Sequence, residues 1–538
     1  MKNSKSLSRR SFVTGGAGAV ALGALGLAGC SSPNAGGGSG SPVSGIQWDE
    51  ETDVVVVGFG GAGASAAINA SDEGASVILL EKAPEEHAGG NSGVCGGWSA
   101  PAAGEKPGAA GIASYGTFNA LRKISIDIID DEEIHGLVHE YETTKEWLVS
   151  LGAEEVDGVV NLGSGYAGFG WIKPIVEGKP GVKVMYETPA KRLIFDPKTK
   201  EVFGVVAESQ GTEINIKAKR GVVLALGGFE NNHFMKQTYY APNAPIYACG
   251  TPYNTGDGIP MVAEVGAKMR GFSSIEWGCH CCKAGSEEIG VALAFSFQDP
   301  DAWDNAIMVN SMGKRFVNET EPTRYGQYIL RPLHNKDQLP ELAYSNSFSK
   351  TGEEDDYINL PMYLICGEKK IKERALFSAA AKDAGNHFAH LRGLYTWSDD
   401  NQAEISKGWV IKADTLEELA RKMNIDADGL VATVAAYEEA CSTGTDLEFG
   451  RDYTLNPIGE GPYYACELGL GIINTQGGPV RDAEHRVLNY DDQPIKRLYS
   501  GGEFGSFYVW RYPGALNVPE ALGNRVAGTN AAREEPWD

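Results

Sequence analysis

A run of small residues, followed by a distant acid, forms the most specific chemical pattern in the sequence. The run consists of Gly58, Gly60, Gly61, Ala62 and Gly63, which gives a GxGxxG spacing, and the acid is Glu81, 23 residues after the first glycine. Such glycines permit a tight turn, a close approach of the backbone to a diphosphate, and close packing of a helix on a strand. The amides of a helix N-terminus favour phosphate charge, and the acid accepts hydrogen bonds from ribose hydroxyls. The pattern therefore predicts a dinucleotide site.

The surrounding residues predict the elements that would position this site. Residues 53–57 (DVVVV) and 76–80 (SVILL) are apolar runs typical of buried parallel strands, and the alanine-rich residues 64–70 favour a helix. Because the glycines lie between a strand and a helix, and the acid ends the second strand, a glycine-rich turn without a ligand is the weaker interpretation. NAD and FAD both fit the pattern.

Later glycine-rich segments favour FAD. They are residues 89–97 (GGNSGVCGG), 222–229 (VVLALGGF), 255–258 (TGDG) and 498–503 (LYSGGE). In combination they resemble the flavoprotein subunits of fumarate reductases, a family of FAD-dependent oxidoreductases with urocanate reductase and 3-ketosteroid Δ1-dehydrogenase as relatives. The resemblance extends from about residue 53 to residue 529. It implies an α/β fold, in which a Rossmann-like FAD-binding domain carries an inserted α+β capping domain.

The resemblance also implies which residues bind FAD. Ala62, Glu81 and Ala190 would bind the ADP half and the adenine, and Asn91, Ser92 and Gly96 would line the diphosphate and the flavin ring. Asp257 and Glu503 would bind ribityl or ribose hydroxyls. Further residues expected to contact FAD, at no particular part of the cofactor, are Lys82, Gly90, Gly97, Ala225, Gly227, Asn517 and Val518. The last two belong to a final segment that would direct a helix N-terminus at the flavin pyrimidine.

Two residues near the start of the expected insertion are candidates for proton transfer. Glu319 ends the run VNSMGKRFVNE, and Arg324 follows shortly after it. By resemblance they would relay protons to the substrate, while hydride passes from flavin N5 to an electron-poor alkene carbon. The alternative is that Glu319 and Arg324 form a structural ion pair.

A C-terminal segment, WRYPGA, resembles the Tyr-Pro-Gly segment of ketosteroid dehydrogenases. Tyr512 could donate a hydrogen bond to an enolate oxygen or act as the proton donor, and Arg511 could bind a carboxylate. Packing and surface roles are the alternatives for both residues. Leu516 occupies a position where that family has a glycine, so the resemblance is partial here.

Other positions depart from the fumarate reductase pattern. Cys366 and Gly367 follow an expected strand where that family has an arginine acid, and Asn474 replaces a substrate histidine. We therefore do not expect fumarate as the substrate. A steroid-like, aromatic or unsaturated-lactone substrate fits better than a small diacid.

The favoured function is reduction of an activated C=C bond in an α,β-unsaturated acid, ketone or lactone. One alternative is a 3-ketosteroid-type dehydrogenase that introduces a double bond. The other is a lipid-anchored flavin electron carrier without substrate turnover. The expected insertion at residues 299–474 disfavours a carrier, because a carrier needs no cap over a substrate.

The N-terminus predicts export. Arg9 and Arg10 precede a short apolar run that ends in Leu-Ala-Gly-Cys at Cys30, which resembles a twin-arginine signal with a lipoprotein cleavage box. We expect a lipid anchor on the outer face of a bacterial cytoplasmic membrane; an ordinary signal peptide is the alternative.

The net charge of −24 disfavours nucleic acid as a partner. The predicted organisation is a signal at 1–30, a flexible tether at 31–46, the FAD-binding domain at 47–298 and 475–538, and the capping domain at 299–474.

Cysteine spacing bears on the source of electrons. Cys279, Cys281 and Cys282 could ligate an iron–sulfur cluster, but their spacing matches no standard pattern, so free or buried thiols are favoured. Lys283 occupies the position where a haem attachment motif needs histidine. We therefore expect no haem in this chain, no metal site, and an external electron donor such as a membrane cytochrome.

Overall fold

The computed structural model describes most of the chain, in separate ranges. These are residues 43, 45–95, 97–101, 129, 131–239, 245–272, 274–295, 300–320, 359–377, 388–506 and 517–537. All but the first belong to one compact unit, Gly45–Asp538. The predicted signal and most of the predicted tether lie outside the described residues, as do Gly96, Arg324, Arg511 and Tyr512.

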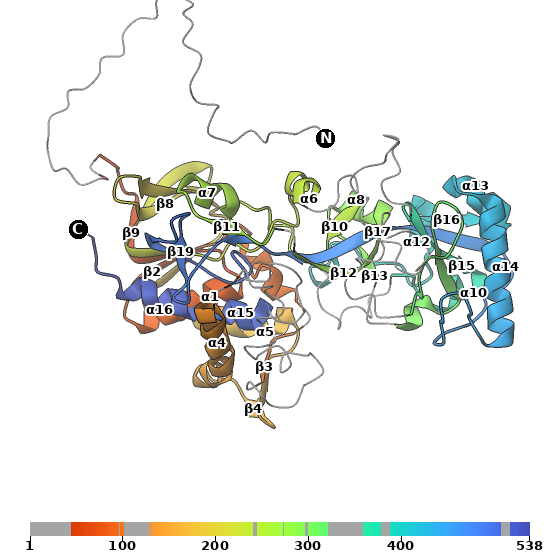
Figure 1. Ribbon diagram of the computed structural model, residues 1–538, viewed down its shortest axis with the longest axis horizontal. Helices are drawn as coiled ribbons and strands as arrows, with labels where there is room; N and C mark the ends of the chain where they lie inside the picture. Colours follow the sequence, from red (N-terminus) through yellow and green to blue (C-terminus); the bar gives the residue numbers. More distant parts are fainter. Residues whose placement is uncertain are drawn as a thin grey trace, which may run out of the picture. The chain divides into compact units, whose positions relative to one another are not determined.

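An eight-stranded sheet carries the glycine run (Figure 1). Its strands follow the order β19 (Arg486–Leu488), β20 (Pro494–Ser500), β8 (Glu201–Ser209), β9 (Thr212–Leu224), β1 (Glu50–Val57), β2 (Val77–Leu80) and β6 (Val182–Met185), with β7 (Ala190–Asp196) paired to β8. The strand β1 is parallel to β2 and β9, and β20 is parallel to β9. The carboxyl ends of these four strands therefore meet at one edge of the sheet, where ligands bind in open α/β sheets. The two predicted strands are confirmed as β1 and β2.

Burial of both faces explains the continuous apolar run in β1. Val54 and Val56 pack with residues of α1 (Gly61–Asp72) and α16 (Arg525–Arg533). Val55 and Val57 pack on the opposite face with residues of β7, β8 and α7 (Gly258–Glu264). Successive side chains of a strand point to opposite faces, so a strand covered on both sides needs apolar residues at every position.

Shorter elements complete this part of the chain. They are η1 (Glu85–His87), η2 (Asn91–Gly93), β3 (Ser99–Pro101), α4 (Asp131–Ser150), β4 (Glu155–Val156), β5 (Val159–Asn161), α5 (Gly165–Glu177), α6 (His233–Tyr239), β11 (Met269–Arg270), β18 (Gly478–Pro479) and α15 (Asn517–Gly523).

A second sheet has seven strands, and β17 (Tyr463–Thr475) is its central strand. The order is β13 (Ala294–Phe295), β12 (Ile275–Cys282), β17, β15 (Met362–Gly367) and β14 (Ala306–Val309), and β10 (Ile246–Ala248) and β16 (Val410–Ala413) also pair with β17. The first half of β17 pairs with β15 and β16, and its second half pairs with β10 and β12. Strands from both sides of residue 299 share this sheet, so sheet membership does not mark the predicted domain boundary there.

Helices α13 (Leu416–Met423) and α14 (Ala427–Thr443) pack on one face of this sheet. Ile307, Val309 and Ile365 share a core with Leu419 and Leu430 of these helices. Other short helices here are α8 (Lys283–Ile289), η3 (Pro300–Trp303), α10 (Glu368–Glu373), α11 (Phe388–Leu391) and α12 (Gln402–Lys407). Within the described ranges, none of the helices combines the length and apolar character needed to cross a bilayer.

Candidate functional site

The glycine run after β1 requires glycine at Gly58, directly after the strand, and at Gly63, in the first turn of α1. Gly58 has a φ angle of +101°, and a Cβ atom there would lie 2.3 Å from the carbonyl oxygen of Ala225. A Cβ atom on Gly63 would lie 1.8 Å from the carbonyl oxygen of Gly58. Both distances are far below van der Waals contact, so only glycine lets α1 and β9 approach the end of β1 this closely.

The two central glycines of the turn face the second glycine-rich segment. A Cβ atom on Gly61 would lie 3.0 Å from Oγ of Ser92, and one on Gly60 would lie 3.5 Å from the carbonyl oxygen of Gly89. Gly90 adopts a φ angle of +54°. Two bare backbone segments therefore lie side by side, and bare backbone next to a helix N-terminus is what the diphosphate of a dinucleotide requires.

The Glu81 carboxylate, directly after β2, accepts two backbone hydrogen bonds and can accept more. Its Oε2 accepts from the backbone N of Phe59 at 2.8 Å, and its Oε1 accepts from the backbone N of Ala83 at 2.7 Å. Burial raises the pKa of Glu81, and these amides oppose the rise. Each carboxylate oxygen keeps a second acceptor position for a ribose hydroxyl. The backbone N of Thr188 donates to the carbonyl oxygen of Glu81 at 2.8 Å, which brings the segment ending at Ala190 to the same strand end.

Lys82 ties the start of α7 to the end of β2. Its Nζ lies 2.5 Å from Oδ2 of Asp257 and 2.6 Å from Oγ1 of Thr255. The Asp257 side chain is 39% exposed, so it can still bind a cofactor hydroxyl while paired with Lys82.

Asn91 links four segments that meet at the carboxyl edge. Its Oδ1 accepts from the backbone N of Thr251 at 3.0 Å. Its Nδ2 donates to Oε1 of Glu230 at 2.7 Å and lies 3.4 Å from Oε2 of Glu503. The sequence motifs predicted Asn91 and Glu503 as site residues but did not include Glu230. The position of Glu230 in the sequence indicates a site residue, because it directly follows the Gly-Gly-Phe turn after β9, at the strand end where ligands bind.

Glu230 is fully buried and held by neutral donors. Its Oε1 also accepts from Nδ2 of Asn254 at 2.8 Å, and its Oε2 lies 3.1 Å from Oγ1 of Thr475. Burial raises its pKa to about 7, against the opposing effect of these hydrogen bonds. The same Asn254 side chain explains Gly227, where a Cβ atom would lie 2.7 Å from the Asn254 Oδ1 atom.

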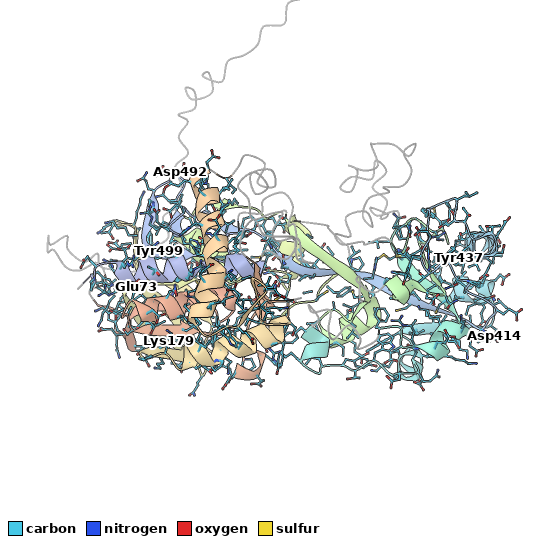
Figure 2. All side chains as sticks on the ribbon, turned by 90° about the horizontal axis from the view of Figure 1, so that it is seen from below. Glu73, Lys179, Asp414, Tyr437, Asp492 and Tyr499 are labelled. Carbon is cyan, nitrogen blue, oxygen red and sulfur yellow. The ribbon has the colours of Figure 1, made fainter. Side chains whose placement is uncertain are left out.

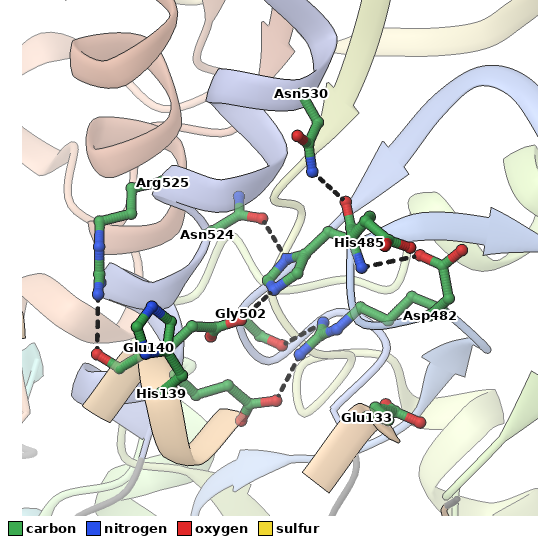
Figure 3. A network of polar contacts seen from close by, with 12 residues as sticks. Glu133, His139, Glu140, Asp482, His485, Gly502, Asn524, Arg525 and Asn530 are labelled. Carbon is green, nitrogen blue, oxygen red and sulfur yellow. Dashed lines mark hydrogen bonds and ion pairs between the residues drawn. The ribbon is translucent and has the colours of Figure 1, made fainter. Parts of the chain in front are cut away.

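A second buried network of polar side chains contacts the backbone at Gly502 (Figure 3). Arg481 donates to Oε1 of Glu520 at 2.8 Å and to the carbonyl oxygen of Gly502 at 3.3 Å. The ring nitrogens of His485 lie 2.7 Å from Oε1 of Glu140 and 3.2 Å from Oδ1 of Asn524. Burial raises the pKa of Glu520 to about 7, while Arg481 opposes the rise. The network fixes α15 against the sheet edge.

Some cofactor candidates are placed by their backbone alone. Helix α15 begins at Asn517, as expected, but the side chains of Asn517 and Val518 lie outside the described residues. A Cβ atom on Gly97 would lie 3.4 Å from the carbonyl oxygen of Gly163. Gly96 lies outside the described residues.

Glu319 forms a buried ion cluster with arginines that the sequence did not single out. Its Oε2 lies 2.7 Å from Nη2 of Arg315 and 3.2 Å from Nη1 of Arg451, and Arg315 also pairs with Asp446 at 3.0 Å. The ring of Tyr437, labelled in Figure 2, lies beneath both guanidinium groups. The alternative expected from the sequence was an ion pair of Glu319 with Arg324, which lies outside the described residues; the observed partners of Glu319 are Arg315 and Arg451. The relay role of Glu319 with Arg324 stays a prediction.

Most of the cysteines whose side chains the structure describes lie in the interior. Cys249, Cys281, Cys282, Cys366 and Cys466 are all buried. Within the part of the chain that the structure describes, no group of three or more His, Cys, Asp or Glu side chains is arranged to hold a metal ion.

Comparison with known proteins identifies the cofactor. A family model described as FAD binding domain matches residues 165–517, and one described as FAD dependent oxidoreductase matches residues 53–161. Vinyl phenol reductase of Lactiplantibacillus plantarum is 28% identical over 512 residues, which cover 89% of this chain and 96% of that protein. The 4-oxocyclohexanecarboxylate 2-dehydrogenase of Sinomonas cyclohexanicum is 28% identical over 390 residues, which cover 66% of this chain and 60% of that protein.

A solved structure shares the fold. The 3-ketosteroid delta1-dehydrogenase from Sterolibacterium denitrificans aligns with a TM-score of 0.66 at 22% identity, over 90% of this chain and 100% of that chain. The family resemblance and the fold class predicted from the sequence are thereby confirmed. Because the FAD binding domain model covers more than half of the chain, and the paired glycine segments with Glu81 fit an adenosine diphosphate, the chain belongs to the FAD binding domain family and is an FAD-dependent oxidoreductase.

Proposed function

We propose that this oxidoreductase acts on a CH–CH bond and reduces an activated carbon–carbon double bond. When bound, FAD supplies the two-electron chemistry. The observation that carries the proposal is the position of the end of β17, a strand of the second sheet, next to the segment that follows β9 of the first sheet. At its end, Oγ1 of Thr475 accepts from the backbone N of Phe229 at 2.7 Å. A substrate held at the end of β17 therefore lies next to the residues that fit FAD.

The residues at the end of β17 support a neutral substrate rather than a diacid. Nε2 of Gln476 donates to Oδ1 of Asn474 at 2.6 Å, and both amides are buried. The Oε1 atom of Gln476 is buried and has no hydrogen-bond partner among the residues that the structure describes. A neutral amide pair with a free acceptor suits a hydroxyl donor, whereas a carboxylate would need a cation. Phenolic, steroid-like or lactone alkenes meet this requirement, and the likeness to vinyl phenol reductase supports an aromatic one.

The proton for the second carbon must come from an acid that reaches the substrate. Glu319 is fully buried and its oxygens are occupied by arginine donors, so we assign that role to Tyr512, with Arg511 or Arg324 as the alternatives. Tyr512→Phe is expected to lower alkene turnover by 10²-fold or more, roughly the contribution of a general acid, while FAD remains bound.

One anaerobic experiment tests the reaction and its direction. The purified holoprotein is reduced with dithionite, and candidate alkenes are screened for recovery of the oxidised flavin spectrum. Reoxidation by a vinyl phenol, enone or unsaturated lactone supports the proposal. Reduction of the oxidised protein by a saturated ketone would favour the dehydrogenase instead, and a flavin that responds to none of these compounds would favour an electron carrier.

We further propose that the protein is exported, anchored through Cys30, and reduced by an external carrier such as a membrane cytochrome. The Arg9-Arg10 pair and the Leu-Ala-Gly-Cys sequence support this proposal. Metabolic labelling with a fatty acid, in the natural chain and in Cys30→Ala, tests the anchor. Loss of label in the variant is expected, and equal labelling would contradict it.

A further inference from the structure

Glu230 is a buried acid that neither the motifs nor the proposed reaction uses. It is fully buried and lies directly after the turn that follows β9. Three side chains from three distant segments, Asn91, Asn254 and Thr475, form hydrogen bonds with its carboxyl group. All three partners are neutral side chains.

The charges around Glu230 leave its protonation state finely balanced. Lys236, on α6, is the cation that attracts it, but Nζ of Lys236 donates to the carbonyl oxygen of Ile246. Glu503 is a second acid near the same atom, because Nδ2 of Asn91 lies 2.7 Å from Oε1 of Glu230 and 3.4 Å from Oε2 of Glu503. Burial raises the pKa of Glu230 to about 7, so a nearby change of charge is sufficient to change its protonation.

Asn91 connects this acid to the FAD site. Its Oδ1 is fixed by the backbone N of Thr251, so its Nδ2 must point at Glu230 and Glu503. In low-dielectric surroundings, negative charge added at the FAD site raises the proton affinity of nearby acids. Glu230 is such an acid, because a hydrogen bond joins it to Asn91.

We propose that Glu230 is a positioning residue that orients the Asn91 amide at the FAD site and takes up one proton when bound FAD receives two electrons. The proton comes from solvent and forms an O–H bond on the Glu230 carboxylate, and the electrons come from the reductant. This uptake compensates part of the charge added to the cofactor. The inference rests on the proposed function only in placing FAD beside Asn91, and not on the identity of the alkene.

The primary test is Glu230→Gln in the holoprotein. Glutamine keeps the size of the side chain and is permanently neutral. We expect FAD to remain bound and reduction to take up about one proton fewer per two electrons near pH 7.5, measured with a pH indicator or from the pH dependence of the flavin potential. Glu213→Gln, an exposed acid on β9, is the matched control and should take up as many protons as the natural protein.

A second measurement needs no variant. In infrared difference spectra of the natural protein, reduction of the flavin near pH 7.5 should produce the C=O band of a protonated carboxyl group. That band should be absent from Glu230→Gln and present in Glu213→Gln. If Glu230→Gln does not fold, Asn254→Ala replaces it: loss of a donor to the carboxylate should move the appearance of the band to higher pH.

The outcomes separate this inference from the proposed reaction. Equal proton uptake by the natural protein and Glu230→Gln, or no carboxyl band on reduction, overturns the inference. A band and a proton difference in a protein that no alkene reoxidises leave the inference in place and remove the proposed function.

Discussion

Nη1 of Arg451 lies 3.2 Å from Oε2 of Glu319, and neither side chain is exposed to solvent. The two residues are 132 positions apart and join the segment after β14 to the segment after α14. With Arg315 and Asp446 they form a charge cluster in which two arginines face two acids. Such a cluster constrains the second sheet and its helices.

Removal of one charge from this cluster should destabilise the protein. Glu319→Gln leaves buried guanidinium charge uncompensated, so we expect the free energy of unfolding to fall by about 3–5 kcal/mol. Urea unfolding followed by tryptophan fluorescence measures this, with exposed Glu417→Gln on α13 as the control. If Glu319→Gln is as stable as the control but loses turnover, the proton-relay role is favoured over the structural one.

Gly63→Ala should abolish FAD binding. The added Cβ atom would overlap the carbonyl oxygen of Gly58, so α1 must move away from the turn that fits the diphosphate. Gly170→Ala, at an exposed position of α5 with no atom within 4 Å of the new Cβ, is the control and should stabilise the protein by about 0.5–1 kcal/mol. Flavin content after purification and thermal unfolding report both effects. A fully yellow Gly63→Ala protein would contradict the assignment of the turn.

Glu81→Gln should weaken FAD binding without preventing folding. The amide group must turn an N–H toward Phe59 or Ala83, each of which already presents an N–H, and the charge that attracts ribose hydroxyls is lost. A hydrogen bond to a charged group contributes about 1.5–3 kcal/mol, so we expect affinity for FAD to fall roughly 10- to 100-fold. Fluorescence titration of apoprotein measures the affinity, with Glu213→Gln as the control. Unchanged affinity would place the ribose elsewhere.

The stability of the protein should depend on pH through Glu230. Because its pKa rises from 4.5 in the unfolded chain to about 7 in the folded state, the folded state binds more protons between these values. The stabilising contribution is complete below pH 4.5 and is lost as pH rises through 7. Relative to Glu230→Gln, the natural protein should lose up to roughly 3 kcal/mol of unfolding free energy over this range.

Urea unfolding at several pH values from 5 to about 8 measures this difference. Glu520 also titrates near pH 7, but it is present in both proteins and cancels in the comparison. Parallel stability profiles for the natural protein and Glu230→Gln would show that Glu230 does not carry the dependence.

The sequence by itself determined strands β1 and β2 of the first sheet and the identity of the cofactor. The glycine spacing, the apolar runs of β1 and β2 and the acid Glu81 are local features, and each fixes a turn, a strand or a hydrogen-bond acceptor without help from distant residues. That is why the family, the cofactor and the fold class could be predicted from motifs.

Only the tertiary structure decided which acids are buried and what they touch. Glu230 and Glu319 are ordinary glutamates in the sequence, yet one is held by neutral side chains and the other by arginines. Asn91 and Thr475 of the first environment and Arg451 of the second come from segments more than 100 residues away. The environment of an acid depends on the strands and helices packed around it, and that packing sets its charge. Sequence spacing carries no information about such distant contacts, so Arg451 could not be named as a partner of Glu319 before the fold was known.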